Sequence, residues 1–542
     1  MPTRRRVTPA LTLAALLALA ACTSDPSPAA GPGGPRAAAG FRLDEVVTGS
    51  TLHSINGLTL RPDGRIGAAN LAGETISEID PRTGAATPLV PSPDGRSDDV
   101  VLNSAGDVLW TDPLQGTVET RGADGTVRTV AGDLPGVNSI AFDRAHRRLF
   151  VGQTFFGDAL WEIDPTGAAP KRLVARDIGQ PNAFAFGPDG QIYAPVGKRK
   201  AVIRIDPETG TTAEIATGFT QPVSVRFDSL DRLYVLDGAT GELIRVDPAT
   251  GAKQTVATLP AADDNMVIGP DDHAYVSNMA DSSVLDVNLA DGAKRVVTQS
   301  PLAFPTDIAA GTNAVFVADN TALRTIDPAT GEVRELARRL ATEIQFPSGI
   351  SVHDDHLVLT SALIGAVQVL DTPGEPLRHV EGFLEPSDAL ELNDGALVVA
   401  EPETGRLIRV DDTTPRTLAE NLGAPTGLAL AGDGRVLATD ATGGRLLGVE
   451  PQTGATTMIA DQLGAPRSVA VAPDGAMIVL DADGRVLRLE PGGGAPTTLA
   501  EGLAVGYLEG PHPRSGGVAV TDDGTVFVTA DKENSVYAIH RT

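Results

Sequence analysis

Six positions in the first half of the chain, about forty residues apart, carry side chains that could do chemistry together. They directly precede the first strand of six successive repeats and are Asn56, Asp98, Asn138, Asn182, Val223 and Asp264. Carboxylate and amide oxygens that converge on one point suit a hard cation such as Ca²⁺. The sequence therefore predicts a site for Ca²⁺ or another divalent cation formed by the five Asn and Asp residues of this set.

The same residue types also have a purely local explanation. Asn and Asp before a strand often accept hydrogen bonds from their own backbone in Asx-turns. In the second half of the chain the corresponding positions carry no carboxylate; they are Thr306, Ser348, Ser387, Thr426, Arg467 and Gly516. Because this contrast occurs on one repeated scaffold, the metal hypothesis stays open beside the local one.

A second set of polar residues is expected on the same face, where the second strands of the repeats end. Four of them follow a residue of the first set by fourteen positions and one by fifteen; the set is Asn70, Asp112, Gln153, Asp237 and Asn278. Loops that vary from repeat to repeat are the usual place for binding residues on a stereotyped frame. We expect these five side chains to contact a ligand.

Two further features of this face can be explained in two ways. Phe155 and Phe156 could stack on a ligand, or they could pack between neighbouring repeats. Lys198 and Arg199, in a short basic run, could attract an anionic ligand, or they could form an ordinary solvated loop.

The elements that must position these residues are short strands. The stretch from Gln180 to Thr217 contains four apolar, β-branched runs separated by turns such as P-D-G and D-P-E-T-G. Proline presets φ, glycine adopts positive φ and Asp accepts bonds from its own backbone, so these breaks are turns and the runs are strands. Four antiparallel strands in about 40 residues are typical of one propeller blade.

Twelve such units follow one another from about residue 41 to the end of the chain, and the last contains only three strands. The motif V-V-T of residues 46–48 recurs at residues 296–298. We therefore expect an all-β protein with two tandem six-bladed β-propellers of four-stranded antiparallel blades, spanning residues 41–293 and 294–542. Each ring is expected to be closed by its N-terminal strand. A single larger ring is the alternative.

The N-terminus indicates export. A basic head and an apolar run end in L-A-A-C, with Cys22 as the only cysteine of the chain. We expect residues 1–21 to be a lipoprotein signal peptide, Cys22 to be lipidated, and residues 22–40 to form a flexible Pro- and Gly-rich tether. An ordinary signal peptide is the alternative, and the choice between general and twin-arginine export stays open.

The net charge of the chain argues against one class of binding partner. With 43 basic and 70 acidic residues the chain carries −27, which repels phosphate backbones and argues against nucleic acid. One cysteine allows no intramolecular disulfide. A monomer is expected, with a small molecule or a cell-envelope protein as partner and membrane contact through the lipid anchor only.

Three phrases resemble a known family. They are S-I-N-G-L-T-L-R-P-D-G (residues 54–64), V-N-S-I-A-F (137–142) and P-N-A-F-A-F-G-P-D-G (181–190), which look like the SMP-30/gluconolactonase-like propellers and their NHL-repeat relatives. That resemblance implies a divalent cation held by one Glu, two Asn and one Asp, and hydrolysis of lactones. By resemblance, Asn138 and Asn182 take the two Asn roles and Asp264 the catalytic Asp role. The chain departs from this pattern at Val223 and has no Glu in the ring.

Three functions follow as hypotheses. The first is a lipid-anchored extracytoplasmic scaffold that binds a ligand or a protein. The second is a metal-dependent hydrolase of lactones or esters in the first ring. The third is a purely structural role in the cell envelope.

Overall fold

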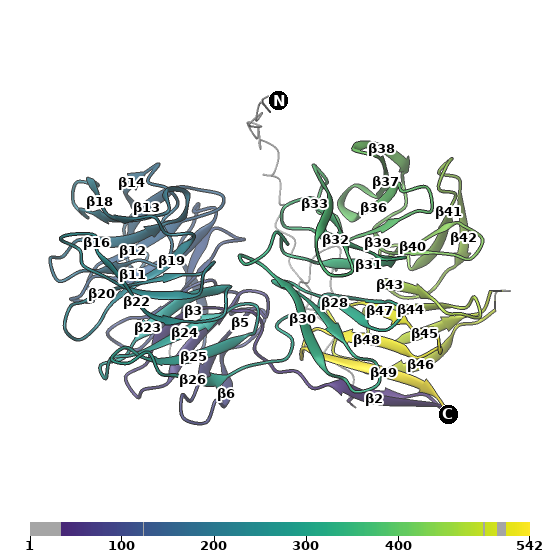
Figure 1. The fold of residues 1–542 in the computed structure, drawn as a ribbon, viewed down its shortest axis with the longest axis horizontal. Helices are drawn as coiled ribbons and strands as arrows, with labels where there is room; N and C mark the ends of the chain where they lie inside the picture. Colours follow the sequence, from purple (N-terminus) through teal and green to yellow (C-terminus); the bar gives the residue numbers. More distant parts are fainter. Residues whose placement is uncertain (1–33, 123, 492–493, 507–515) are drawn as a thin grey trace.

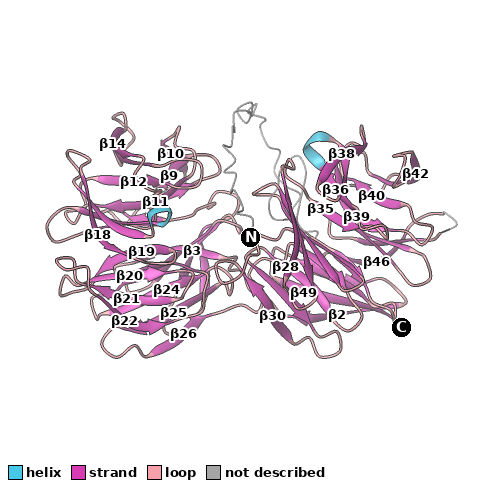
Figure 2. Ribbon diagram, turned by 45° about the horizontal axis from the view of Figure 1, so that its top comes forward, coloured by secondary structure: helices cyan, strands magenta, loops and turns pink. Residues whose placement is uncertain are grey.

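The computed structural model describes residues 34–122, 124–491, 494–506 and 516–542. Within these ranges the chain folds into twelve antiparallel sheets, most of them formed by four strands that are consecutive in the sequence. Two short 3₁₀ helices, η1 (Gly197–Arg199) and η2 (Pro402–Thr404), interrupt the strands. Figure 2 shows that sheets make up both halves of the molecule. The prediction of an all-β fold built from four-stranded antiparallel blades is confirmed.

The first ring contains six sheets in chain order. Their strands are β3 (Ile55–Leu60), β4 (Ile66–Asn70), β5 (Thr75–Ile79), β6 (Ala86–Val90); β7 (Val100–Leu102), β8 (Val108–Asp112), β9 (Thr117–Arg121), β10 (Val127–Ala131); β11 (Val137–Phe142), β12 (Leu149–Gln153), β13 (Ala159–Ile163), β14 (Arg172–Arg176); β15 (Ala185–Phe186), β16 (Ile192–Val196), β17 (Ala201–Ile205), β18 (Thr212–Thr217); β19 (Pro222–Phe227), β20 (Leu233–Asp237), β21 (Glu242–Val246), β22 (Lys253–Thr258); β23 (Asp263–Ile268), β24 (His273–Asn278), β25 (Ser283–Asn288), β26 (Lys294–Thr298). Each inner strand packs against the next, and β23 packs against β3, so this ring closes on itself.

The second ring is built in the same way. Its strands are β27 (Asp307–Ala310), β28 (Val315–Asp319), β29 (Ala322–Ile326), β30 (Val333–Arg338); β31 (Gly349–His353), β32 (His356–Ser361), β33 (Ala366–Asp371), β34 (Pro376–Glu381); β35 (Asp388–Glu391), β36 (Leu397–Glu401), β37 (Arg406–Asp411), β38 (Thr414–Ala419); β39 (Pro425–Leu430), β40 (Val436–Asp440), β41 (Arg445–Val449), β42 (Thr456–Ala460); β43 (Pro466–Val471), β44 (Met477–Asp481), β45 (Val486–Leu489), β46 (Thr497–Glu501); β47 (Val518–Val520), β48 (Val526–Ala530), β49 (Ser535–Arg541). Here β47 packs against β27, which closes the second ring and rules out a single larger one.

The predicted closure of the rings is wrong. The N-terminal strand β2 (Phe41–Val47) pairs with β49, so it completes the last blade of the second ring. Residues 294–298 form β26, the fourth strand of the last blade of the first ring. Both V-V-T motifs therefore belong to outer strands. Each outer strand completes the last blade of one ring and is followed by a linker to the first blade of the other ring. The sequence-based prediction placed each of the two strands in the wrong ring.

The predicted tether is shorter than expected. Residues 36–37 form strand β1 (Arg36–Ala37), which pairs with the outer strand β46, and Arg36 forms an ion pair of 2.8 Å with Glu501. The predicted signal peptide (residues 1–21) and residues 22–33, with Cys22, lie outside the described residues. Across the part of the chain that the structure describes, none of the helices has the length and apolar character that crossing a membrane requires.

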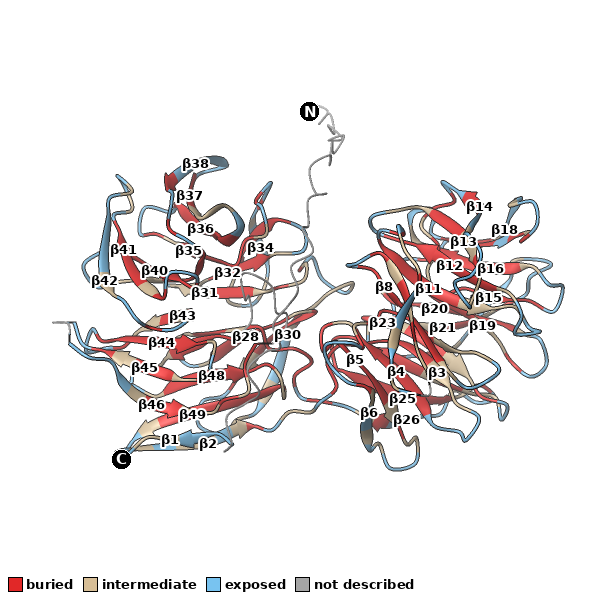
Figure 3. Ribbon diagram, turned by 180° about the vertical axis from the view of Figure 1, so that it is seen from behind, coloured by how far each residue is buried: buried red, intermediate tan, exposed pale blue. Residues whose placement is uncertain are grey.

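The blade turns behave as the sequence predicts. In the repeat of residues 180–217, Gly190 of the P-D-G turn and Gly210 of the D-P-E-T-G turn have φ values of 74° and 70°, which favour glycine. Asp206 accepts backbone hydrogen bonds from Glu208 and Thr209 at 2.8 and 2.9 Å. Buried side chains of the inner and middle strands, mainly Val, Ile, Leu and Ala, fill the space between blades, and Figure 3 shows exposure concentrated at the loops and outer strands.

The two rings lie side by side and touch (Figure 1). Arg338 of the second ring donates to the carbonyl of Ala261 at 2.8 Å and forms an ion pair with Asp281, both in the first ring. His53, on the linker between β2 and β3, lies 2.9 Å from the carbonyl of Asp531. Burial lowers the pKa of His53 to about 4, so the imidazole of His53 is neutral at physiological pH.

Candidate functional site

The mouth of the first ring is the end of its central channel where the inner strands begin. Neighbouring blades are joined at this level by hydrogen bonds. The amide of Gly57 donates to the carbonyl of Asp98 at 2.7 Å, and the hydroxyl of Thr111 donates to the carbonyl of Asn138 at 2.5 Å. The blade geometry thus places the predicted residues at one level around the channel, although they are far apart in sequence.

Asp98 is the most unusual residue of this mouth. Its side chain is 7% exposed, and within the described residues its carboxylate has no hydrogen-bond partner. Burial raises the pKa of Asp98 well above its usual range, and the nearby carboxylates of Asp264 and Asp99 raise it further. A buried carboxylate without a hydrogen-bond donor is costly to keep charged. A positively charged or hydrogen-donating ligand group at this position would therefore stabilise the ionised form of Asp98.

Asp264 lies close enough to Asp98 for the two acids to influence each other. Burial raises the pKa of Asp264 to about 6, while the Arg339 guanidinium and the Asn56 side chain act in the opposite direction. The structure therefore brings together three of the five predicted cation ligands, Asn56, Asp98 and Asp264. A carboxyl group with a pKa near 6 changes charge close to physiological pH.

The remaining two predicted ligands differ. The side-chain oxygen of Asn182 accepts a hydrogen bond from the amide of Ala183 at 2.9 Å, so the local Asx-type explanation holds for Asn182. The amide of Asn138 has no partner among the described residues. Among the residues that the structure describes, no group of three or more His, Cys, Asp or Glu side chains is arranged to hold a metal ion. A cation at this mouth would depend on two carboxylates plus amides.

A polar network that the sequence did not reveal lies one residue deeper in the channel. The carboxylate of Asp99 accepts hydrogen bonds from the side chain of Asn265 at 3.1 Å and from the amide of Ile140 at 3.3 Å. Arg226 donates to Asn265 at 2.9 Å. Burial raises the pKa of Asp99 to about 6, against the effect of the Arg226 charge. The only signal for this network was the Asp or Asn that directly follows Asp98 and Asp264.

The five polar residues predicted at the ends of second strands have partners within the fold. Asp237 caps a turn by accepting from the amides of Thr220 and Gln221 at 2.6 and 3.0 Å, and Gln153 accepts from the indole of Trp161 at 2.7 Å. Asn70, Asp112 and Asn278 bond backbone groups of their own or neighbouring turns in the same way. The structure thus gives each of these side chains a structural role.

The aromatic and basic residues of this face are open to solvent. Phe155 and Phe156 are 55% and 52% exposed, so the alternative that they pack between blades is wrong. Lys198 and Arg199 lie in helix η1 and are also exposed. Arg199 approaches Glu214 at 3.6 Å.

The second ring contributes a loop to the mouth of the first. The loop after β30 extends toward the first ring in Figure 1, and a Cβ placed on Gly238 would lie 3.3 Å from Leu340 and 3.1 Å from the mouth residue Val223. Leu340 has φ of 72°, a conformation that is an outlier for a bulky residue. The neighbouring Arg339 stabilises the ionised form of Asp264, so residues from both rings shape this site.

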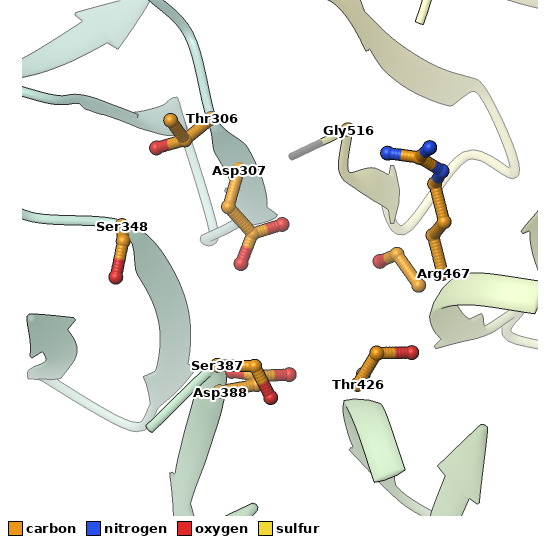
Figure 4. Close-up of a pocket in the computed structure, with 10 residues that line it drawn as sticks. Thr306, Asp307, Ser348, Ser387, Asp388, Thr426, Arg467 and Gly516 are labelled. Carbon is orange, nitrogen blue, oxygen red and sulfur yellow. The ribbon is translucent and has the colours of Figure 1, made fainter. Parts of the chain in front are cut away.

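The mouth of the second ring forms a small polar cavity (Figure 4). The six positions compared in the sequence carry no carboxylate, but Asp307 and Asp388 line the cavity one residue further along the chain. Burial raises the pKa of Asp307 to about 7. The space that a water molecule can occupy there measures about 20 Å³, which is room for roughly one or two waters.

Comparisons with known proteins add only weak similarities. No protein-family model and no curated protein matches the chain. A virginiamycin B lyase from Staphylococcus aureus aligns at 15% identity and a TM-score of 0.36, covering 59% of this chain and 96% of that chain. A candidate gluconolactonase aligns at 16% identity and a TM-score of 0.37, covering 45% of this chain and 94% of that chain.

A third similar structure is the extracellular domain of a candidate one-component system from B. thetaiotaomicron. It aligns at 11% identity and a TM-score of 0.33, covering 90% of this chain and 76% of that domain. TM-scores this low carry no argument about function. The fold of the chain rests on the strand pairing and ring closure described above.

Proposed function

We propose that this protein is a binding scaffold, with its ligand site at the mouth of the first ring. The ligand would present a positively charged group, either a divalent cation such as Ca²⁺ or an organic ammonium. The observation that carries the proposal is Asp98, a carboxylate that is 7% exposed and has no donor among the described residues. A bound cation would offset the cost of burying Asp98 beside Asp264.

The surrounding residues support this role. Asp264 and the amides of Asn56 and Asn138 supply further oxygen ligands at the same level, which is the chemistry that hard cations prefer. Arg339 already supplies one positive charge near Asp264, which leaves Asp98 as the acid in need of a counter-charge.

Melting temperature measured against increasing CaCl₂, ZnCl₂ or putrescine tests the proposal. A ligand that binds only the folded state raises the melting temperature as its concentration rises. At least one of these probes should do so, and Asp98→Asn should abolish the effect. The matched control is Asp247→Asn, which removes the same charge from an exposed turn. Equal responses of both variants and the unmodified chain would overturn the proposal.

A second candidate function is hydrolysis of lactones or esters, and the pKa of Asp264 favours it. A carboxylate with a pKa of about 6 is suited to accept a proton from an attacking water near neutral pH. Asp98, with the amides of Asn56 and Asn138, would hold a divalent cation that polarises the substrate. Turnover of simple lactones that is lost in Asp264→Asn but kept in Asp247→Asn would favour this function over a binding scaffold.

We also propose that the protein is exported and anchored on the extracytoplasmic face of the membrane by a lipid on Cys22. The support is the sequence motif L-A-A-C after a basic and apolar N-terminus. Labelling of the chain by radioactive palmitate in growing cells, and its loss in Cys22→Ser, would test this. Label that persists in the variant would contradict it.

A further inference from the structure

Three neighbouring loops of the first ring carry exposed apolar and basic side chains, and we call these loops together the loop arc. It consists of the loop after β8 (residues 113–116), the loop after β12 (154–158) and helix η1 with Lys200 (197–200). Its exposed side chains are Leu114, Phe155, Phe156, Lys198, Arg199 and Lys200. The loop arc lies on the mouth face of blades two to four, and nothing in the proposed cation site uses it.

Backbone contacts join the two loops that carry the apolar part of the loop arc. The amide of Gly136 donates to the carbonyl of Pro113 at 3.2 Å, and the amide of Thr154 donates to the carbonyl of Gly136 at 2.8 Å. A Cβ placed on Gly136 would lie 3.2 Å from the Cβ of Phe156. The residues beside Leu114 and Phe156 therefore contact each other through Gly136.

The basic part joins the apolar part through the loop before β15. The side chain of Gln180 donates to the carbonyl of Phe155 at 3.3 Å, and a Cβ placed on Gly179 would lie 2.9 Å from the Cδ of Arg199. Glu214 partly offsets Arg199 at 3.6 Å. Lys198 and Lys200 have no carboxylate partner among the described residues.

The apolar side chains are displayed rather than packed. Leu114, Phe155 and Phe156 are each more than half exposed, and large apolar side chains that gather at exposed loops are candidates for an interaction surface. Phe155 has a φ of 58°, which is a strained conformation for an aromatic residue. The strands of blades three and four lie in the part of the first ring away from the second ring (Figure 1), and the exposed fractions given above are those in the presence of both rings.

We propose that the loop arc docks on a phospholipid surface that contains anionic headgroups. Apolar side chains at the tips of separate loops can enter the headgroup boundary without a shaped partner, and flanking lysines meet the lipid charge. The net charge of −27 acts against an anionic surface only weakly beyond about 8 Å at physiological salt. Docking through this arc would add a second membrane contact to the predicted lipid anchor.

Vesicle co-sedimentation of the full chain carrying Cys22→Ser tests this, because no acyl chain then contributes. Binding is expected to vesicles of phosphatidylglycerol and phosphatidylcholine, weaker to phosphatidylcholine alone. Phe155→Ser/Phe156→Ser should lower the partition coefficient at least about tenfold. Lys198→Gln/Lys200→Asn should lower it on the anionic vesicles by up to about fivefold for each lysine, and Asn tolerates the positive φ of residue 200.

The matched control is Arg147→Gln/Leu230→Ser, which removes an exposed cation and an apolar side chain that is 68% exposed from turns on the opposite face. It should bind as the parent does. Absence of vesicle binding, or equal loss in the control, would overturn the proposal. Capture of a protein by the Phe155 and Phe156 loop without vesicle binding would also overturn it, and thermal melting shows whether each variant remains folded.

Discussion

The two mouths of the molecule are built on the same scaffold but use their side chains in opposite ways. In the second ring, the hydroxyl of Thr426 donates to the carbonyl of Pro466 at 3.1 Å, and that of Ser387 donates to the carbonyl of Pro425 at 3.3 Å. Each of these bonds joins one blade to the next. In the first ring, five of the six equivalent positions carry Asn or Asp, and Asp98 makes no such bond among the described residues.

This difference shows what separates structure from function on a propeller. A short hydroxyl side chain reaches the neighbouring carbonyl and stabilises the ring. An Asp at the same place cannot donate when ionised, so a buried carboxylate there raises the energy of the folded state. The first ring keeps these side chains at a cost in stability, which is the pattern expected of a binding site.

The largest expected effect is on the pH dependence of stability. Burial raises the pKa of Asp307 to about 7 and that of Asp263 to about 8, and that of Asp98 well above its usual range. The folded state then binds protons more tightly than the unfolded chain, so stability is present at low pH and lost as pH rises through these values. His53 has the opposite sign, since its lowered pKa removes stability only below about pH 6.5.

We therefore expect the melting temperature to fall between about pH 4 and pH 8 in differential scanning calorimetry, with His53 opposing part of the fall below about pH 6.5. Asp98→Asn should make this fall shallower and raise the free energy of unfolding at the alkaline end by about 1–3 kcal/mol, because an unpaired buried charge is removed. If Asp98→Asn is less stable than the parent at high pH, the carboxylate has a stabilising partner and the contrast between the mouths disappears.

How much of this architecture could be predicted from sequence depended on how local the signal was. The blades and their turns followed from short-range chemistry, such as the positive φ of Gly210 in its D-P-E-T-G turn. The pairing of β2 with β49 could not be predicted from local sequence, because the backbone edge of an outer strand can pair with the last blade of either ring. Only the packing of the two rings selects between β2 and β26.

The site was predictable to a similar degree. Asn56, Asp98 and Asp264 share a repeat position, so their meeting at one mouth followed from the blade geometry. Asp99 and Asp307 were missed as channel residues because each lies one residue beyond the predicted set, at or just before the start of an inner strand, where alternation alone does not show which side chain faces the channel. Arg339 has no repeat signature at all, since it acts across the contact between rings.

An intermediate effect is expected from breaking one blade-to-blade bond of the second ring. Thr426→Val keeps the volume but removes a buried hydroxyl that bonds Pro466 and Thr439, which should cost about 1–2 kcal/mol in chemical denaturation. The matched change in the first ring, Asn138→Ser, removes an amide without a partner and should cost less than about 1 kcal/mol. Equal losses would mean that the two mouths are stabilised alike.

The smallest expected effect tests whether the second ring acts on the site of the first. Arg339→Gln removes the positive charge that favours ionised Asp264, so the pKa of Asp264 should rise above its value of about 6. The stability of the protein should change little, because the two groups do not form a direct ion pair. Carbon-13 NMR of labelled aspartate side chains, assigned with Asp264→Asn, would measure this shift. Arg334→Gln on β30, the strand before the loop that contains Arg339, where the arginine pairs with Glu332 at 2.8 Å, should leave the pKa of Asp264 unchanged. If Arg339→Gln also leaves it unchanged, the loop after β30 covers the mouth without tuning it, and the acids of the first ring depend on that ring alone.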